Sequence, residues 1–283
     1  MMTSSTIQPG QPATAERVGA VPPAARRPGL AGTLRSEFTK IRSLRSTYYT
    51  LVAFFLAGVG FAIAAAWGNR ANGGHPLFDP TATSLRGAVY LGELIIVVIG
   101  ALVITSEYGT RMISTSLTAM PRRGVLYAAK AVVLTCVTFT VALVTSLASF
   151  FVGQAVLGPD HGGASIASPD ALRSVLLATV FVTCCALLAF GLGAIIRYTA
   201  GAVTTLFGLV FLIPLLGQAL PNNWFHDIAR WLPGGGALNP IIATQPAPGQ
   251  SYLFGPYGEL AVFAGYAAIA LIAGFLLFRR RDN

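Results

Sequence analysis

The sequence has little charge and few reactive side chains. Only 10% of its 283 residues are charged, whereas an average soluble domain has about 25%. Its three cysteines are too few for a disulfide scaffold, and its three histidines, His75, His161 and His226, lack the spacing of a metal site. Because 54% of the residues are apolar, we expect a polytopic membrane protein without a bound metal, rather than a soluble enzyme.

The sequence also lacks common catalytic motifs. It has no G-x-x-x-x-G-K-[ST] phosphate loop, no H-E-x-x-H and no G-x-S-x-G. Two glycine pairs, Gly58 with Gly60 and Gly191 with Gly193, lie inside apolar runs and are typical of helix packing. We therefore expect no enzyme activity, no catalytic residue and no cofactor in this chain, and any ATP hydrolysis must come from a separate chain.

Six apolar stretches are long enough to cross a bilayer, which requires about 20 residues of helix. Their runs are continuous, whereas the strands of a membrane barrel alternate apolar and polar residues. The sequence thus predicts an all-α protein with six transmembrane helices. The expected spans are 48–67, 88–105, 131–152, 174–196, 200–220 and 260–278.

The basic residues predict the orientation of these spans. Of the 19 lysines and arginines, 15 lie before the first span, between the second and third, after the fourth, or after the last. The other 4 lie in the alternate segments. Cytoplasmic loops are enriched in lysine and arginine, so we expect both termini in the cytoplasm. The same distribution accounts for the net charge of +9 through topology and lipid contact, and no nucleic-acid partner is expected.

The N-terminal segment is rich in proline. Residues 1–29 contain five prolines among small and polar residues and are expected to form a disordered cytoplasmic tail. No apolar signal segment precedes the first span, so that span itself is expected to start insertion.

Cys136, Cys184 and Cys185 all fall inside predicted spans, where small packing residues are expected rather than disulfides.

Residues 30–47 are expected to form an amphipathic helix at the cytoplasmic membrane surface. Glu37 and Arg45 fall on its apolar side, which indicates that part of this side contacts protein rather than lipid. A simple basic helix beside the membrane is the alternative. The apolar side comprises Leu30, Leu34, Phe38, Ile41, Leu44 and Tyr48.

A second amphipathic helix is expected in the loop between the second and third spans, at about 109–120. Pro121 would stop it, because proline cannot continue a helix, and Gly124 would let the chain turn into the next span. Such a helix either floats at the interface or offers a surface to a soluble partner. One side carries Met112, Ile113, Ser116, Leu117 and Met120, and the other carries Arg111, Ser114, Thr115 and Thr118.

Three segments together resemble the permeases of type-2 ATP-binding-cassette (ABC) exporters, especially those of high-GC Gram-positive bacteria. The first, Ser36–Tyr48, is similar to the entry to their first span. The second resembles the motif after their second span, and Ile228–Pro233 resembles an element before the last span. The resemblance covers the chain from about residue 30 to its end. The second segment comprises Glu107, Tyr108, Thr110, Ile113, Leu117, Pro121, Arg122 and Arg123.

This resemblance implies a function and partners. In such permeases the helix before the first span and the loop helix, called the coupling helix, dock onto a separate ATPase subunit that binds ATP and magnesium. Two permease copies, or a permease and a paralogue, pair in the bacterial plasma membrane, and the segment 221–258 re-enters the membrane or lies at its outer interface. The substrate is left open among drugs, lipids, peptides and similar molecules. The implied coupling residues are Glu37, Lys40, Glu107, Tyr108, Arg111, Ile113, Leu117, Pro121, Arg122 and Arg123.

Two residues inside the spans are candidates for the transport pathway. Glu93 is an acid close to the expected outer end of the second span, where it either reaches the interface or serves a pathway or helix pairing. Pro214 is expected to kink or loosen the fifth span. Two other classes remain open: an ATP-independent secondary transporter or channel, and a non-transporting immunity or sensor protein of the same fold.

Overall fold

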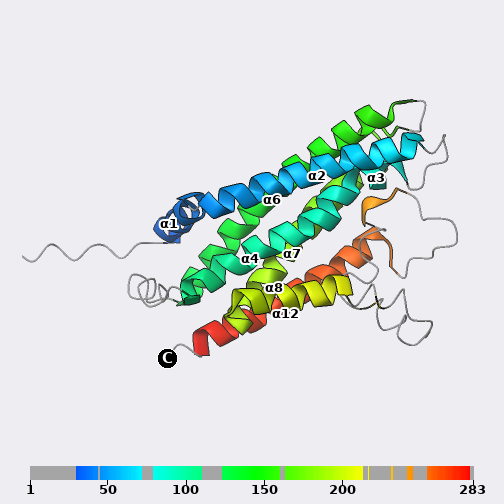
Figure 1. Cartoon of the computed structure of the whole chain (residues 1–283). Coiled ribbons are helices and arrows are strands. Elements are labelled where there is room, and N and C mark those ends of the chain that lie inside the picture. Colours follow the sequence, from blue (N-terminus) through cyan, green and yellow to red (C-terminus); the bar gives the residue numbers. More distant parts are fainter. Residues whose placement is uncertain are drawn as a thin grey trace, which may run out of the picture.

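The computed structural model describes residues 30–43, 45–71, 79–109, 123–159, 163–212, 216, 231, 241–244 and 254–280. Regular structure in this part of the chain is helical, as expected for an all-α protein (Figure 1). The predicted tail 1–29, Pro214, nearly all of the predicted coupling helix and most of 221–258 lie outside the described residues. The helices are α1 (Leu30–Ser43), α2 (Arg45–Ala71), α3 (Pro80–Arg86), η1 (Gly87–Leu91), α4 (Gly92–Gly109), α6 (Arg123–Leu157), α7 (Pro169–Ile196), α8 (Thr199–Phe207), η3 (Gly208–Leu212) and α12 (Pro256–Arg280).

Among the described residues, 5 helices are long and apolar enough to cross a membrane. Four of them are α2, α6, α7 and α12, and α3, η1 and α4 form the other as one 30-residue stretch, Pro80–Gly109. They correspond to five of the six predicted spans. The predicted fifth span begins as the shorter helix α8, and most of its second half lies outside the described residues.

Two predicted boundaries near the chain's charged segments are wrong. The helix expected over 30–47 ends at Ser43, and α2 already begins at Arg45. Residues 45–47 therefore belong to the spanning helix and not to the helix that precedes it. The second spanning helix continues to Gly109 rather than ending at residue 105. At the end of α4 the extension follows from burial, since Glu107 is 7% exposed; at the start of α2 the added residues Arg45 and Ser46 are exposed.

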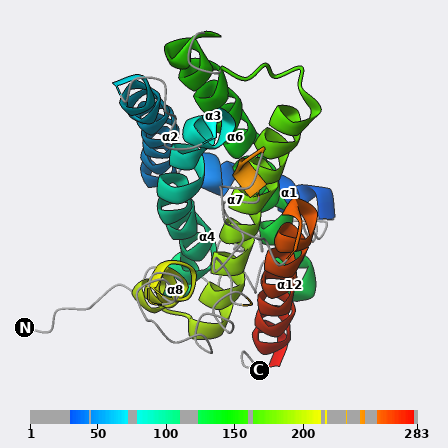
Figure 2. The same ribbon diagram turned by 90° about the vertical axis from the view of Figure 1, so that its right-hand side faces the viewer.

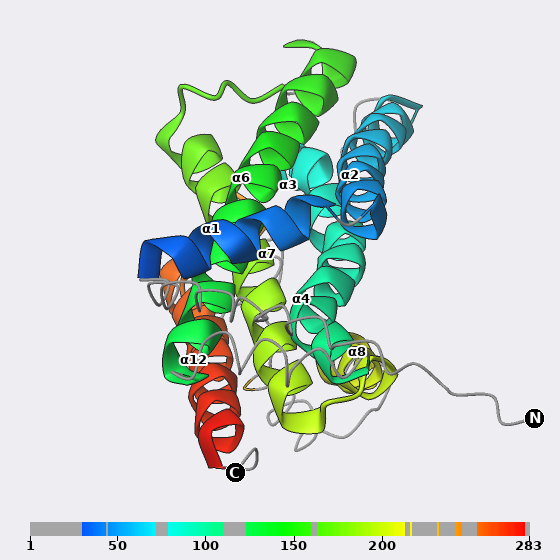
Figure 3. The ribbon, with the colours of Figure 1, turned by 90° about the vertical axis from the view of Figure 1, so that its left-hand side faces the viewer.

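Successive spanning helices run in alternating directions, so α1, the end of α4, the start of α6 and the end of α12 lie at one end of the bundle (Figure 1). At this end α1 lies across the bundle instead of along it (Figure 3) and packs against α6 and α2. We call this the basic end, because most basic residues of the described helices gather there. They are Arg35, Lys40, Arg42, Arg45, Arg123, Lys130, Arg197, Arg279 and Arg280, against Arg70, Arg86 and Arg173 towards the other end.

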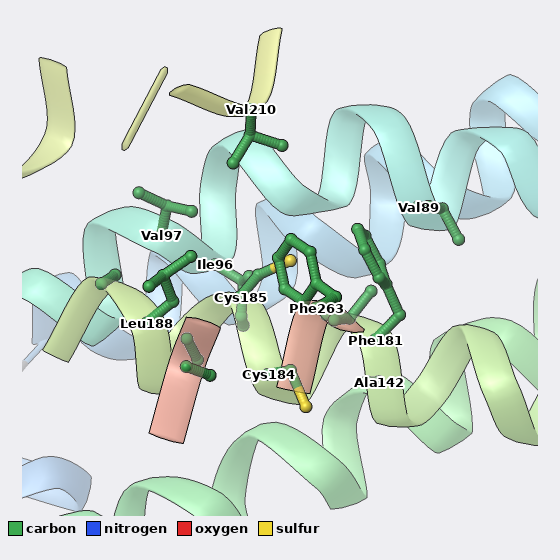
Figure 4. Packing of buried hydrophobic residues seen from close by; sticks show 14 of the residues in the cluster. Val89, Ile96, Val97, Ala142, Phe181, Cys184, Cys185, Leu188, Val210 and Phe263 are labelled. Carbon is green, nitrogen blue, oxygen red and sulfur yellow. The ribbon is translucent and has the colours of Figure 1, made fainter. Parts of the chain in front are cut away.

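Helix α7 is the centre of the bundle. It packs against α12, α4, α6 and α8, and Figure 2 shows it between α4 and α12. Phe181 on α7 stacks on Phe263 of α12, with ring centroids 4.5 Å apart. Cys184 and Cys185 project from different sides of α7 into the core (Figure 4), as expected for packing residues. Cys136 is exposed on α6, so its predicted packing role is wrong.

Close crossings between these helices depend on glycine. A Cβ atom added at Gly100 of α4 would lie 2.3 Å from the carbonyl oxygen of Ala186 on α7, and one at Gly191 would lie 2.6 Å from the backbone of Ala270 on α12. Gly58 and Gly193 are similarly close to neighbouring side chains, whereas Gly60 faces open space. Three of the four glycines predicted to pack helices therefore do so, and Gly60 does not.

Candidate functional site

The candidate site is an ion-pair cluster at the basic end, made by Glu37, Lys40, Glu107 and Lys130. We call it the basic-end cluster. Glu37 and Lys40 come from α1, Glu107 from the last turn of α4 and Lys130 from the third turn of α6. The 13 residues between α4 and α6 hold the rest of the predicted coupling segment, so the cluster joins both flanks of that segment to α1.

Glu37 reaches the cluster because it lies on the buried face of α1. Thr33, Glu37 and Ile41, spaced one helical turn apart, are 2%, 3% and 9% exposed. Phe38 is 49% exposed. The buried face is therefore rotated away from the apolar stripe expected from the sequence, since α1 turns its acid, not its aromatic residue, towards α6.

Lys130 is the central cation of the cluster. Its Nζ lies 2.7 Å from Glu37 Oε2 and 2.6 Å from Glu107 Oε1. Lys40 Nζ lies 2.8 Å from Glu37 Oε1 and 3.1 Å from the same Glu107 oxygen. Two acids thus face two bases at charge-assisted distances, and the cluster is neutral overall.

Burial makes this balance important. Lys130 and Glu37 are nearly inaccessible, whereas the Lys40 side chain is 40% exposed. Removing one partner of a buried ion pair leaves an uncompensated charge, which typically costs about 3–5 kcal/mol. For Lys40, burial lowers the pKa, but the hydrogen bond to Glu37 and the charges of Glu107 and Glu37 outweigh it. The pKa of Lys40 is raised overall, so this lysine stays cationic at neutral pH.

Glu107 lies beyond the end that the sequence predicts for the second span. It belongs to the last turn of α4. An acid there opposes the partial negative charge of a helix C-terminus, so the two lysines stabilise a carboxylate that its own helix disfavours. Its second oxygen, Oε2, is buried without a hydrogen-bond partner among the described residues.

Tyr108 and Arg197 form a second contact at this end. The Arg197 guanidinium lies over the Tyr108 ring, 4.8 Å from its centroid, a distance typical of a cation–π interaction. Arg197 ends α7 with φ of 61°, and its backbone N–H donates to the Gly193 carbonyl. The strained cap places the side chain over α4, so this contact joins the ends of α4 and α7.

The sequence therefore identifies most of this site but misses Lys130 and Arg197 as members. Lys130 is the only lysine adjoining an apolar run, between Ala129 and Ala131, and this placement could have indicated a buried partner. Among the predicted coupling residues, Arg123 begins α6 and takes part in none of the ion pairs between described residues. Arg111, Ile113, Leu117, Pro121 and Arg122 lie outside the described residues.

Glu93 occupies a second position of interest. It lies well inside the Pro80–Gly109 helix and is 1% exposed, which favours the pathway or helix-pairing alternative over the interfacial one. The helix begins eight residues earlier than expected, which moves Glu93 away from its end. The described residues hold no group of three or more histidines, cysteines and acids that could bind a metal.

These features define a multi-pass helical membrane protein with a charged cluster at its basic end. The chain matches the family model described as "ABC-2 family transporter protein" over residues 33–216, and it belongs to this family. The matched region contains the whole basic-end cluster and Glu93. The chain is thus a permease of an ABC transporter. A search of curated proteins found no match.

Proposed function

We propose that this chain is the membrane-spanning subunit of an ATP-driven exporter in a bacterial plasma membrane, working with a separate ATPase subunit. Two permease chains, identical or paralogous, form the transport unit, and the partner ATPase binds ATP and magnesium. The family match supports the permease class. The observation that carries the proposal further is the basic-end cluster, because it ties α1 to both flanks of residues 110–122.

The cluster can transmit a displacement because its charges are buried and paired. An ATPase that pushes on α1 moves the helix that holds Glu37. An ATPase that pushes on residues 110–122 moves the segment between α4 and α6, the helices that hold Glu107 and Lys130. Separating these groups would leave buried charges unpaired. Movement of α1 is therefore passed to α4 and α6 together, and these helices run the length of the bundle (Figure 1).

The distribution of basic residues supports a cytoplasmic location for the basic end. Cysteines introduced at Ser165 and Gln250, in a background with the three native cysteines replaced by alanine, should react with an impermeant thiol reagent in intact cells. A cysteine introduced at Ser116 should react only after the membrane is permeabilised. The reverse labelling pattern would contradict both the orientation and the cytoplasmic docking of an ATPase.

The docking role of the loop can be tested with a candidate ABC ATPase subunit co-expressed with the permease. Replacing both Ile113 and Leu117 with aspartate should abolish co-purification of the ATPase, because it removes the apolar face predicted for the loop helix. Reversing Arg122 and Arg123 together should have a smaller effect, since an exposed ion pair contributes about 0–1 kcal/mol.

Gly60→Ala provides the matched control, because Gly60 faces open space on α2. All variants should insert into the membrane in wild-type amounts, since none places a charge inside an apolar run of a spanning helix. Undiminished ATPase recovery with the doubly substituted loop would show that residues 110–122 only connect two spans.

A further inference from the structure

Three arginines at the basic end take no part in the basic-end cluster. Arg123 begins α6, and Arg279 and Arg280 end α12. None of them belongs to an ion pair formed between described residues. We call these three residues the arginine group. Whereas each lysine of the basic-end cluster faces an acid, the arginine group is a set of positive charges without an acidic partner in the described part of the chain.

Phe275 of α12 brings the two helix ends together. A Cβ atom added at Gly124, the residue after Arg123, would lie 3.2 Å from the Phe275 ring. The Arg279 guanidinium lies over the same ring, 5.6 Å from its centroid. The start of α6 therefore lies beside the last turns of α12 (Figure 3). The arginine group thus occupies one small area, although its members are far apart in the sequence.

Arg123 is the member whose charge the protein itself compensates least. Its Nη1 atom is buried without a hydrogen-bond partner among the described residues. It also stands at the N-terminus of α6, where the partial positive charge of a helix disfavours a cation. Arg279 and Arg280 differ, because the C-terminus of their own helix favours positive charge. An anion next to Arg123 would offset both its burial and the field of α6.

The exposed side of α12 leads from the apolar part of the bundle to the arginine group. Ile269, Ile272 and Leu276 are 65%, 61% and 47% exposed. Arg280 follows Leu276 by four residues and therefore lies on the same side of the helix. An apolar stripe that ends in basic residues matches a phospholipid, with its acyl chains along the stripe and its phosphate at the end. A soluble anion would use only the arginines.

The chemistry of guanidinium favours a phosphate as the anion. Its planar fork of N–H donors binds phosphate oxygens in pairs, and a phosphate has oxygens enough for more than one arginine. Basic sites between transmembrane helices at the cytoplasmic surface bind anionic lipid headgroups in this way. The adjoining sequence keeps the area positive, because Arg122 and Arg281 outnumber Asp282.

We propose that the arginine group binds the phosphate of an anionic phospholipid, whose acyl chains lie along Ile272 and Leu276 of α12. The juxtaposition of Arg123 with the end of α12, where an exposed apolar stripe meets Arg280, is the basis of the proposal. The site requires the basic end to lie at the membrane surface. It requires neither ATP nor a partner subunit, so it goes beyond the proposed function.

The test measures quenching of a single tryptophan by brominated phospholipids, with the full chain in vesicles and no ATPase. Leu276→Trp places the reporter one helical turn from Arg280, and phenylalanine replaces the three native tryptophans. The vesicles mix phosphatidylglycerol and phosphatidylcholine at fixed composition, with bromine on the acyl chains of one lipid or the other. With all three arginines present, phosphatidylglycerol should associate at the reporter at least about threefold more strongly than phosphatidylcholine.

Replacing all three arginines with glutamine should abolish this preference. Arg123→Gln alone should remove much of it, and Arg123→Lys, which keeps the charge, should retain more. Arg42→Gln is the matched control, because it removes an exposed arginine of α1 at the same end, and it should leave the preference unchanged. Unaltered quenching by brominated phosphatidylcholine alone shows that α12 of each variant still lies in the bilayer.

Equal association of the two lipids in the presence of all three arginines would overturn the proposal. A preference that survives the triple substitution, or that falls equally with Arg42→Gln, would overturn it too. Displacement of phosphatidylglycerol by excess glycerol phosphate at constant ionic strength would assign the arginines to a soluble phosphate instead. If no lipid preference exists and the triple variant fails to retain a co-expressed ATPase, the arginines serve protein docking. None of these failures would contradict the ATP-driven function.

Discussion

Replacing Lys130 with methionine should strongly destabilise the protein and detach α1 from the bundle. The lysine is buried and pairs with Glu37 and Glu107 at 2.7 and 2.6 Å. Its loss leaves two acids close together with only the half-exposed Lys40 to compensate them. We expect a loss of about 3–5 kcal/mol, measured as a lower thermal midpoint in nanodiscs and as faster protease cleavage within α1.

Lys40→Met is the matched control, because it removes a lysine from the same cluster at a site that is 40% exposed. Its effect should be no more than about 1 kcal/mol. A triple variant, Glu37→Gln with Glu107→Gln and Lys130→Met, removes the buried charges together. Its thermal midpoint should return most of the way from that of Lys130→Met to that of the wild type. It should still fail to transmit movement from the ATPase to the spanning helices. Equal effects of Lys130→Met and Lys40→Met would contradict the assignment of Lys130 as the central cation.

Substituting Gly100 should have the second large effect, on the packing of α4 against α7. A Cβ atom at this position would lie 2.3 Å from the Ala186 carbonyl oxygen, and backbone atoms cannot move aside as a side chain can. Gly100→Ala should therefore cost about 1–3 kcal/mol, and Gly100→Leu should prevent recovery of folded protein. Folded yield by size-exclusion chromatography and the thermal midpoint measure both effects.

Gly60→Ala serves again as the control, because no atom lies within 4 Å of the added Cβ. It should leave yield unchanged, since alanine is the better helix former. If Gly100→Ala behaves like Gly60→Ala, the two helices do not cross as closely as the structure indicates.

Most of the fold follows from hydrophobic runs in the sequence, because a bilayer requires about 20 apolar residues whatever their order. Helix ends are less predictable. Glu107 and Tyr108 are polar enough to be placed in a loop, yet α4 continues through both. Their partners, Lys130 and Arg197, come from other helices, and a local pattern does not contain such contacts.

The same reason explains which parts of the site were predictable. Glu37 was conspicuous as an acid on an apolar helical stripe, and Glu107 as part of a motif. The apolar neighbours of Lys130 indicate burial, but they do not show which acids pair with it, because Glu37 and Glu107 come from other helices. For Glu93 the sequence leaves the interface open as an alternative, because the polar residues of α3 conceal the start of its helix. Asp79 caps that start by accepting from the Ala82 N–H.

The most direct measurement of the central claim is ATP turnover by a candidate ABC ATPase subunit that co-purifies with the permease, with and without the permease in lipid nanodiscs. We expect the ATPase to be retained on wild-type nanodiscs, with a turnover that differs from that of the free subunit. With the triple-substituted cluster, it should be retained but no longer show this change. Turnover that is the same with the permease, without it and with the altered cluster would contradict an ATP-driven function coupled through Glu37, Glu107 and Lys130.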